Sequence, residues 1–310
     1  MAGDYNGVFL HHCPQGGLPR KGIVTLMNFL RTCLLLSILT VLLVLVGHLM
    51  GGPSGASTAF VFALAMNLGA YWFSDRIVLA MYHATPLSEA EAPQVYRAVR
   101  ELATRDRIPM PKLYLLPSAT PNAFATGRSP KRAAVAVTAG LLQLMSEEEL
   151  KGVLAHELSH VKNRDTLVMS LAAAIAGAIA MLAHWARWGL MFGGRRDDRR
   201  GSSSGVQVIA LVLIMILAPL AAMLIQLAIS RTREYGADDT GAHLTGNPHG
   251  LAAALEKLDA AVRARPMEHA NPATAHLFIV NPLHAGAIAK LFSTHPPIAE
   301  RVRRLRSMRL

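Results

Sequence analysis

Long stretches without a charged residue constrain this chain more than any other feature of its sequence. The longest covers residues 32–74. Within it, residues 32–50 and 56–73 each approach the length of about 20 residues that a helix needs to cross a bilayer. The glycine-rich segment 51–55 between them is typical of a turn. We therefore predict a transmembrane hairpin over residues 27–77.

A second pair of uncharged runs follows later in the chain, at 167–185 and 206–229. Both runs have spanning length. Only 16% of all residues are charged, whereas soluble proteins average about a quarter. The sequence thus predicts four apolar membrane helices, with a second hairpin over 167–229. The expected fold class is mainly α and integral to the membrane, with a small β-sheet in the soluble part.

Basic residues set the expected orientation of these helices. Arg31 and Arg76 flank the first hairpin, whereas its connecting turn carries no charge. By the positive-inside rule, both ends of this hairpin lie in the cytoplasm. The connector 186–205 carries five arginines against two aspartates, which opposes the rule if the second pair crosses fully. We expect full or nearly full crossing; the alternative is that the second pair projects partly into the cytoplasm.

The remaining residues form three polar segments. Glycines and prolines predict a poorly ordered leader over 1–26, whereas helical and alternating patterns predict folded subdomains over 78–166 and 230–310. The expected elements of the first subdomain are a helix over 89–105, strands over 112–116 and 133–138, and a further helix that Ser146 caps together with Glu149.

The net charge of +11 raises the question of a polyanionic partner. Only 6% of residues are aromatic, and no basic stretch alternates with stacking residues, so nucleic acid is not the expected partner. An anionic lipid surface is expected instead, because a protein with membrane helices meets such a surface directly.

Two histidines four residues apart indicate the chemistry of this chain. His156 and His160 lie on one face of the expected helix and can direct ring nitrogens at one ion. Glu157 lies beside the first histidine, where it can take a proton from water that zinc activates. Small and apolar neighbours predict that this helix is buried, where unpaired polar groups are costly. We therefore predict a catalytic zinc site with Glu157 as general base.

A catalytic zinc ion needs a third protein ligand, and Glu234 is favoured. Glu234 lies four residues beyond the fourth apolar run, and His160 lies seven residues before the third. At 1.5 Å per residue these offsets are about 6 and 10 Å, so antiparallel packing brings both side chains to a similar depth. Asp238, one helical turn further, is expected to accept a hydrogen bond from a ligand histidine. The other candidate ligands are Asp165, Asp238, His184, His243, His276 and His284.

Several segments together resemble the HtpX family of membrane zinc peptidases, which are gluzincins related to the type-I CAAX prenyl proteases. The similar segments are His156-Glu-Leu-Ser-His160, Ser230-Arg-Thr-Arg-Glu-Tyr-Gly-Ala-Asp238, Pro121-Asn-Ala-Phe-Ala-Thr-Gly127 and Ser293-Thr-His-Pro-Pro297. They keep their order and spacing over residues 27–310, so the resemblance covers nearly the whole chain.

The resemblance implies a gluzincin-like protease core built from the two soluble subdomains. His156, His160 and Glu234 would bind one zinc ion per chain, with Glu157 as the catalytic base. Asp238 would support the ligands from behind. The chain would then be a zinc-dependent endopeptidase that cuts misfolded or damaged membrane proteins.

The resemblance also implies substrate contacts and a location. The segment 122–126 would be an edge strand along the cleft, where Asn122 would contact a substrate peptide. His295 and Arg301 would stabilise the oxyanion of the reaction. The enzyme would serve stress response and quality control in the bacterial inner membrane, with its active site facing the cytoplasm.

Other functions stay open at this point. A catalytically silent scaffold would hold a structural metal, which needs a fourth protein ligand such as His243 or His276. A CAAX-type prenyl protease would use the same site on prenylated peptides. A transporter is disfavoured, because no carboxylate or basic group lies within the apolar runs. The sequence carries no signal for an oligomeric state.

Overall fold

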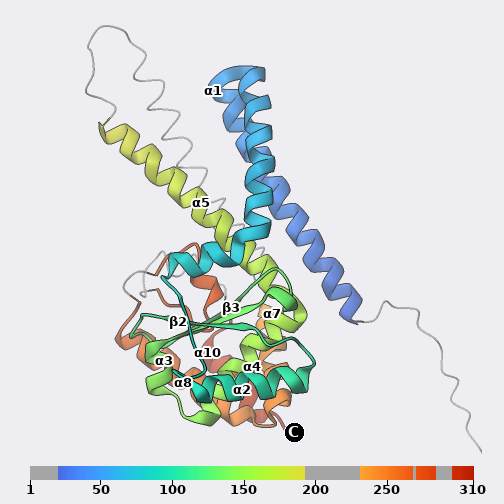
Figure 1. Cartoon of the computed structure of the whole chain (residues 1–310), viewed down its shortest axis with the longest axis vertical. Helices are drawn as coiled ribbons and strands as arrows, with labels where there is room; N and C mark the ends of the chain where they lie inside the picture. The colour runs from blue at the N-terminus through green and yellow to red at the C-terminus, as the bar shows by residue number, and fades with distance from the viewer. Residues whose placement is uncertain (1–19, 193–230, 268–269, 284–294) are drawn as a thin grey trace, which may run out of the picture.

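A long helical hairpin projects from one end of a mixed α/β unit (Figure 1). The computed structural model describes residues 20–192, 231–267, 270–283 and 295–310. This part of the chain is mostly helical and contains one small mixed sheet, which confirms the predicted fold class in its general form.

Helix α1 (Arg20–Met81) forms both arms of the hairpin. Its helical conformation is interrupted at Gly51 and Gly52, and Gly52 has a φ of 59°, which a residue without Cβ adopts at low cost. The break lies where the sequence predicts a turn. Asn67 on the second arm donates hydrogen bonds to the Thr40 hydroxyl and the Leu36 carbonyl on the first arm, at 2.8 and 3.3 Å. These bonds fasten the two arms together.

Two segments of α1, Leu26–His48 and Gly51–Met81, are long and apolar enough to cross a membrane. They overlap the predicted spans. Because α1 already begins at Arg20, the last residues of the predicted leader are helical, and residues 1–19 lie outside the described part.

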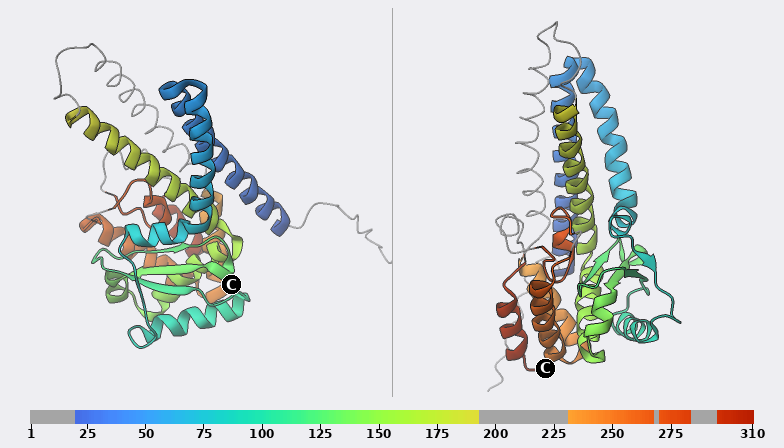
Figure 2. Two further views of the ribbon diagram at one scale, coloured as in Figure 1. Left: turned by 45° about the horizontal axis from the view of Figure 1, so that its top comes forward. Right: turned by 90° about the vertical axis from the view of Figure 1, so that its left-hand side faces the viewer.

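Helix α5 (Asp165–Phe192) contains the third predicted span. From Asp165 to Ile179 it is largely buried and packs along α1, as Figure 2 shows from two sides. The fourth predicted span, 206–229, and the connector residues 193–205 lie outside the described residues. Two membrane-length helices are therefore found in the described ranges, and the prediction of four is not confirmed.

The sheet has four strands in the order β1-β2-β4-β3. Strand β2 pairs in parallel with β4, and β1 and β3 pair antiparallel with β2 and β4. Strand β4, with its alternating valines, corresponds to the strand predicted over 133–138, and β2 has the predicted bounds 112–116. The bounds are Thr85–Pro86 for β1, Lys112–Leu116 for β2, Ala123–Thr126 for β3 and Ala134–Thr138 for β4.

Further helices pack on the sheet or on one another and complete the α/β unit. They are α2 (Pro93–Asp106), α3 (Ala139–Leu144), α4 (Glu147–Asn163), α7 (Arg231–Thr245), α8 (Pro248–Ala264) and α10 (Ile298–Ser307), with 3-10 turns η1 (Pro130–Arg132) and η3 (Ala275–Leu277). The predicted helix over 89–105 begins later, at α2 Pro93, because proline suits the first turn of a helix.

Helix α4 is the centre of the core. Ser146 and Glu149 form the expected capping box at its start. Twelve of its 17 residues are buried, so it is covered on nearly every side. A Cβ on Gly241 of α7 would lie 3.0 Å from the His156 backbone nitrogen, and glycine thus allows α7 to approach α4 closely. This close contact positions the side chains described next.

Candidate metal centre

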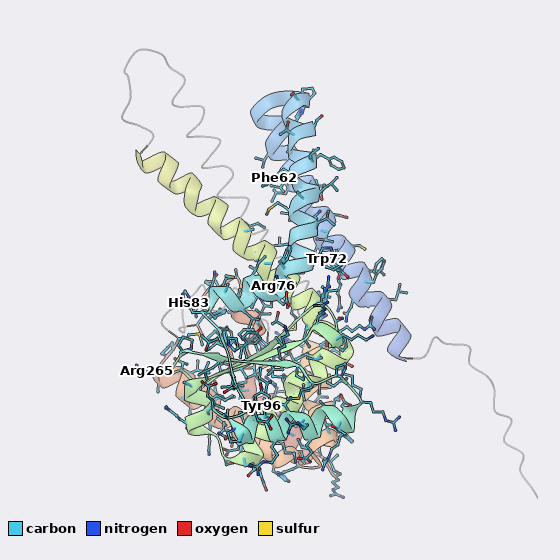
Figure 3. All side chains as sticks on the ribbon, viewed as in Figure 1. Phe62, Trp72, Arg76, His83, Tyr96 and Arg265 are labelled. Carbon is cyan, nitrogen blue, oxygen red and sulfur yellow. The ribbon has the colours of Figure 1, made fainter. Side chains whose placement is uncertain are left out.

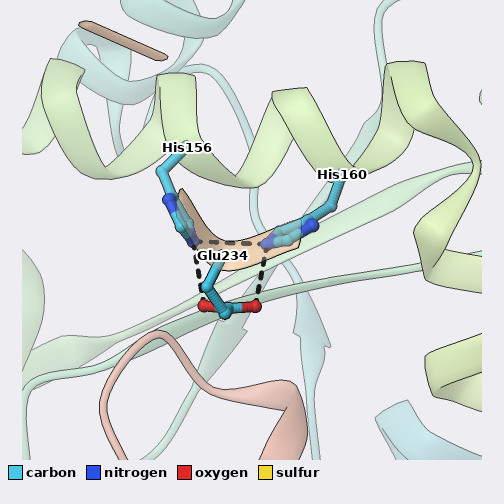
Figure 4. A group of neighbouring side chains, drawn as sticks. All are labelled: His156, His160 and Glu234. Atoms are coloured by element: carbon cyan, nitrogen blue, oxygen red, sulfur yellow. Dashed lines mark hydrogen bonds and ion pairs between the residues drawn. The ribbon is translucent and has the colours of Figure 1, made fainter. Parts of the chain in front are cut away.

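Three side chains from two helices converge beside α4 (Figure 4). His156 and His160 come from α4 and Glu234 from α7, and all three are buried. The two Nε2 atoms lie 3.3 Å apart. The Glu234 carboxylate oxygens lie 3.8 Å from His156 Nε2 and 3.5 Å from His160 Nε2.

These separations fit one small cation. Tetrahedral coordination with bonds of about 2.0–2.2 Å places neighbouring ligand atoms about 3.3–3.6 Å apart. The three donor atoms lie within 4.8 Å of one another, and imidazole nitrogen with carboxylate oxygen is a donor set for divalent transition metals. The group has three protein donors within the described residues, which leaves a fourth position for water or substrate.

The ring of His156 is oriented from the C-terminal part of the chain. Its Nδ1 lies 2.9 Å from an Asp238 carboxylate oxygen, which fixes the proton on Nδ1 and leaves the Nε2 lone pair facing the other donors. Arg301 of α10 in turn donates two hydrogen bonds to Asp238, at 2.7 and 2.8 Å. A third guanidinium bond, at 3.0 Å, goes to the Ile279 carbonyl. Arg301 is fully buried, so this network is anchored by a charge pair inside the protein.

The ring of His160 is oriented from the membrane side. Its Nδ1 lies 3.3 Å from Asp165, the first residue of α5. The other carboxylate oxygen of Asp165 accepts a hydrogen bond from Asn28 of α1 at 3.1 Å. Asn28 also accepts from Arg233, the neighbour of Glu234, at 3.4 Å. The first arm of the hairpin thus contacts Asp165, which orients His160, and Arg233, which precedes Glu234 on α7.

The surroundings act differently on the two histidines: burial and the charge of Arg301 lower the pKa of His156, whereas the charges around His160 favour its cationic form. Burial alone lowers the pKa of His160, but the hydrogen bond to Asp165 and the charge of Glu234 outweigh it and raise that pKa to about 9. Burial also raises the pKa of Glu234, yet the charges of His295 and His160 hold it well below its usual value. The field at His160 Nε2 thus stabilises positive charge, which a metal ion supplies.

Glu157 lies next to the first histidine and points toward strand β3. Burial raises the pKa of its carboxyl group to about 7, and a backbone contact with Ala125 lowers it in part. A carboxyl group whose pKa lies near neutrality can both accept and return a proton. The role of Glu157 as catalytic base stays a prediction.

Strand β3 is an edge strand of the sheet, as the sequence predicts. The Asn122 carbonyl accepts a hydrogen bond from the backbone N–H of Thr138 in β4. Because every second residue of an antiparallel strand bonds to its neighbour, the backbone groups of Ala123 and Ala125 face away from β4. The Ala123 carbonyl accepts from Ile279. The outward groups of Ala125 lie on the side of Glu157.

Two residues predicted to contact substrate have other neighbours in the structure. The Asn122 amide is fully buried and holds the chain at Val280, donating to its carbonyl at 2.8 Å. The Arg301 guanidinium, expected near the oxyanion, is hydrogen bonded to Asp238 and also lies 3.8 Å from a Glu234 carboxylate oxygen. A buried guanidinium needs a carboxylate partner, and Asp238 supplies it. His295 does approach the donors: its Nδ1 lies 3.1 Å from Glu234, and its buried Nε2 has no hydrogen-bond partner within the described ranges.

The alternative ligands of the sequence are elsewhere. His243 is exposed and hydrogen bonded to the Asp239 carbonyl, and His276 is bonded to the Met169 carbonyl. Asp165 and Asp238 contact the Nδ1 atoms of His160 and His156, respectively. His284 and the side chain of His184 lie outside the described residues. The sequence did not predict that Asn28 lies near this site. For Asp165, the one indication of a contact with His160 was its position five residues later in the chain.

Two histidines and a glutamate on one helix, with a carboxylate donor on a second, form an arrangement that is typical of metallopeptidases. A sequence profile of Peptidase family M48 matches residues 89–309, and the chain belongs to this family. The protein is therefore a metalloprotease.

Its relatives make the resemblance more specific. The Protease HtpX homolog of Syntrophobacter fumaroxidans is 59% identical, over 90% of this chain and 98% of the relative. The Protease HtpX homolog of Pyrococcus furiosus is 54% identical, over 90% and 96%. These matches confirm the predicted resemblance, and with the apolar helices they identify a membrane metalloprotease. The crystal structure of S. mikatae Ste24p is similar at a TM-score of 0.49 and 19% identity, covering 92% of this chain and 66% of that one.

Proposed function

We propose that this chain is a zinc-dependent endopeptidase in which His156, His160 and Glu234 bind one Zn²⁺. The observation that carries the proposal is the convergence of these three buried donors with both histidine Nδ1 atoms directed at carboxylates. Each ring is thereby fixed in the tautomer that leaves Nε2 free as a ligand. A structural zinc site would be closed by a fourth protein ligand, and neither His243 nor His276 lies at this group.

The chemistry follows from the residues around the donors. Zinc bound there would lower the pKa of a water molecule and polarise the scissile carbonyl group. Glu157 would accept a proton from the attacking water and return it to the leaving nitrogen. Its pKa of about 7 supports both transfers near neutral pH. The unpartnered Nε2 of His295 supports a role in hydrogen bonding to the oxyanion.

The substrate would bind as an added strand. The outward backbone groups of Ala125 lie beside Glu157, which supports pairing between β3 and an extended peptide. Main-chain pairing depends little on side chains, so it suits a protease that accepts unfolded or damaged membrane proteins of many sequences. Asn122 would act indirectly in this arrangement, by holding the start of β3.

The active site would face the cytoplasm of a bacterium, at the inner membrane. Arg31 and Arg76 lie at the ends of the hairpin that adjoin the α/β unit, and the turn at Gly51 and Gly52 carries no charge. This distribution supports a cytoplasmic α/β unit through the positive-inside rule. An enzyme placed there would meet anionic lipid headgroups and misfolded membrane proteins, in keeping with a role in quality control under stress.

The test compares the purified wild-type chain with Glu157→Gln. We expect the variant to retain its zinc, because Glu157 is not among the donors, while cleavage of an unfolded protein such as casein falls by about 10²–10⁴-fold. Zinc content is measured by metal analysis and cleavage by gel, each with and without a chelator. Undiminished cleavage by the purified variant, or full wild-type cleavage after the metal is stripped, would refute the proposal.

A further inference from the structure

Three arginines without carboxylate partners gather where the second arm of α1 meets the α/β unit. They are Arg76 of α1 and Arg128 and Arg132 of the loop between β3 and β4, and none forms an ion pair with any residue that the structure describes. The Arg128 guanidinium lies 3.7 Å from the centre of the Trp72 ring. A pocket of about 170 Å³ lies among these residues, and Asp75 is its one acidic neighbour. We call it the arginine pocket.

An apolar groove adjoins the arginine pocket. Its volume is about 940 Å³, and it is lined mainly by the second arm of α1 and by α5, with Leu39 of the first arm also in its lining. Phe73 lines both the groove and the arginine pocket, so the two cavities meet at this ring. Figure 3 shows Phe62, Trp72 and Arg76 in this order along α1 toward the α/β unit. The groove runs along this part of α1 from Phe62 to Met81, and the arginine pocket lies beside it at the level of Trp72 to Arg76.

We propose that the groove and the arginine pocket together bind one anionic phospholipid. An acyl chain would lie in the groove, and the phosphate would be held by Arg76, Arg128 and Arg132. Guanidinium groups match phosphate geometry with paired hydrogen bonds. Tryptophan is enriched at the level of the lipid headgroups, where Trp72 would lie. The proposal rests on the membrane location proposed above and is independent of the peptidase chemistry.

The bound phosphate would also brace the proposed substrate strand. The loop that carries Arg128 and Arg132 continues directly from β3 through Gly127, whose φ is 126°. A Cβ at Gly127 would lie 2.4 Å from the Arg132 carbonyl oxygen, so the loop is tightly closed at its base. The Gly127 carbonyl accepts from Thr166 of α5 at 2.8 Å. A headgroup that fixes the two arginines thus fixes a short, closed loop at the end of β3.

The first test uses the full chain with Glu157→Gln, so that lipid binding is measured whether or not the chain cleaves proteins. Native mass spectrometry of the detergent-purified chain compares dioleoyl phosphatidylglycerol with dioleoyl phosphatidylcholine. We expect a preference for the anionic lipid, and the double change Arg128→Gln with Arg132→Gln should weaken its binding by roughly 30-fold.

The matched control removes the same charge elsewhere, through Arg97→Gln with Arg263→Gln on α2 and α8. The Arg263 side chain is 77% exposed, and neither Arg97 nor Arg263 lines the groove or the arginine pocket. Anionic lipid binding should be unchanged in this control. An equal loss in both double variants would mean that net charge alone attracts the lipid, and would overturn the proposal. The thermal midpoint of each variant verifies that it is folded.

A second variant tests the groove. A Cβ on Gly69 would meet no atom within 4 Å, so Gly69→Leu extends into the groove without a backbone clash. We expect it to weaken binding of the dioleoyl lipid severalfold while glycerol phosphate binding stays the same. If glycerol phosphate binds the wild-type chain as tightly as the lipid, or if Gly69→Leu leaves lipid binding intact, the site does not hold a phospholipid.

Discussion

The two histidines of the metal site are supported by different parts of the molecule. His156 is backed by Asp238 and, behind it, by the buried charge of Arg301 near the C-terminus. His160 is backed by Asp165 and, behind it, by the neutral amide of Asn28 in the first membrane arm. One support is therefore ionic and internal to the α/β unit, whereas the other is weaker and depends on the hairpin.

The two supports are therefore expected to contribute differently to the stability of the fold. A buried ion pair strongly destabilises a fold when one partner is removed, so the support of His156 is part of the core. A single neutral hydrogen bond contributes much less, so the support of His160 can change without unfolding the chain. The metal site is thus firmly tied to the protease fold and more loosely tied to the membrane anchor.

The largest effect is expected from Arg301→Met, which leaves Asp238 buried without a counter-charge. Removing one partner of a buried pair costs about 3–5 kcal/mol, so the thermal midpoint should fall steeply. The control is Arg303→Met, because Arg303 lies on the same helix with a side chain that is 76% exposed. Adding Asp238→Leu to Arg301→Met should restore much of the stability but not metal binding. Equal midpoints for the Arg301 and Arg303 variants would contradict the ionic support.

The second prediction compares the two carboxylates directly. Asp165→Asn and Asp238→Asn should each lower metal affinity by about 10–100-fold, since residues behind metal ligands have effects of this size. Asp238→Asn should also lower the thermal midpoint of the metal-free chain, because it removes the carboxylate that is hydrogen bonded to the buried Arg301 and leaves the more distant Glu234 carboxylate, at 3.8 Å. Metal titration and calorimetry separate the two effects. A loss of metal-free stability in Asp165→Asn as large as in Asp238→Asn would remove the distinction between the supports.

The smallest effect is expected from Asn28→Ala. It removes the hydrogen bond to Asp165, worth about 0.5–1.5 kcal/mol, together with those to the Asn163 carbonyl and from Arg233, and should weaken metal binding about threefold to tenfold. The thermal midpoint should fall less than in Arg301→Met, because no buried ion pair is broken. Asn67→Ala is the matched control, because this amide lies on the other arm and bonds within the hairpin. Metal affinity of the control should equal that of the wild-type chain. If both variants bind metal alike, the anchor does not support the site.

Much of the centre could be predicted because its signals are local. The capping box at Ser146, the spacing of His156 and His160 and the neighbouring Glu157 all lie within 15 residues, where helix geometry fixes their relations. Glu234 could also be predicted, because its distance from the fourth apolar run is similar to that of His160 from the third, which places both side chains at a similar depth. The roles of these residues remain part of the proposed function.

Asp238 was expected beside a ligand histidine, but the residues behind Asp238 and Asp165 could not be predicted, because these contacts join distant parts of the chain. Arg301 meets Asp238 across 63 residues, and Asn28 meets Asp165 across 137. The basic pattern near the C-terminus is typical of a solvated helix face, and only the packing of α10 shows that Arg301 points inward. An asparagine at the edge of an apolar run likewise carries no sign of its partner.

The contact of Asn28 has a consequence for where this protease can act. A fragment cut free of its first membrane arm would lose Asn28 and, with it, part of the support behind His160. Such a fragment would release its metal more readily than the anchored chain. The anchor would thereby limit the activity of any fragment that is released from the membrane by accident.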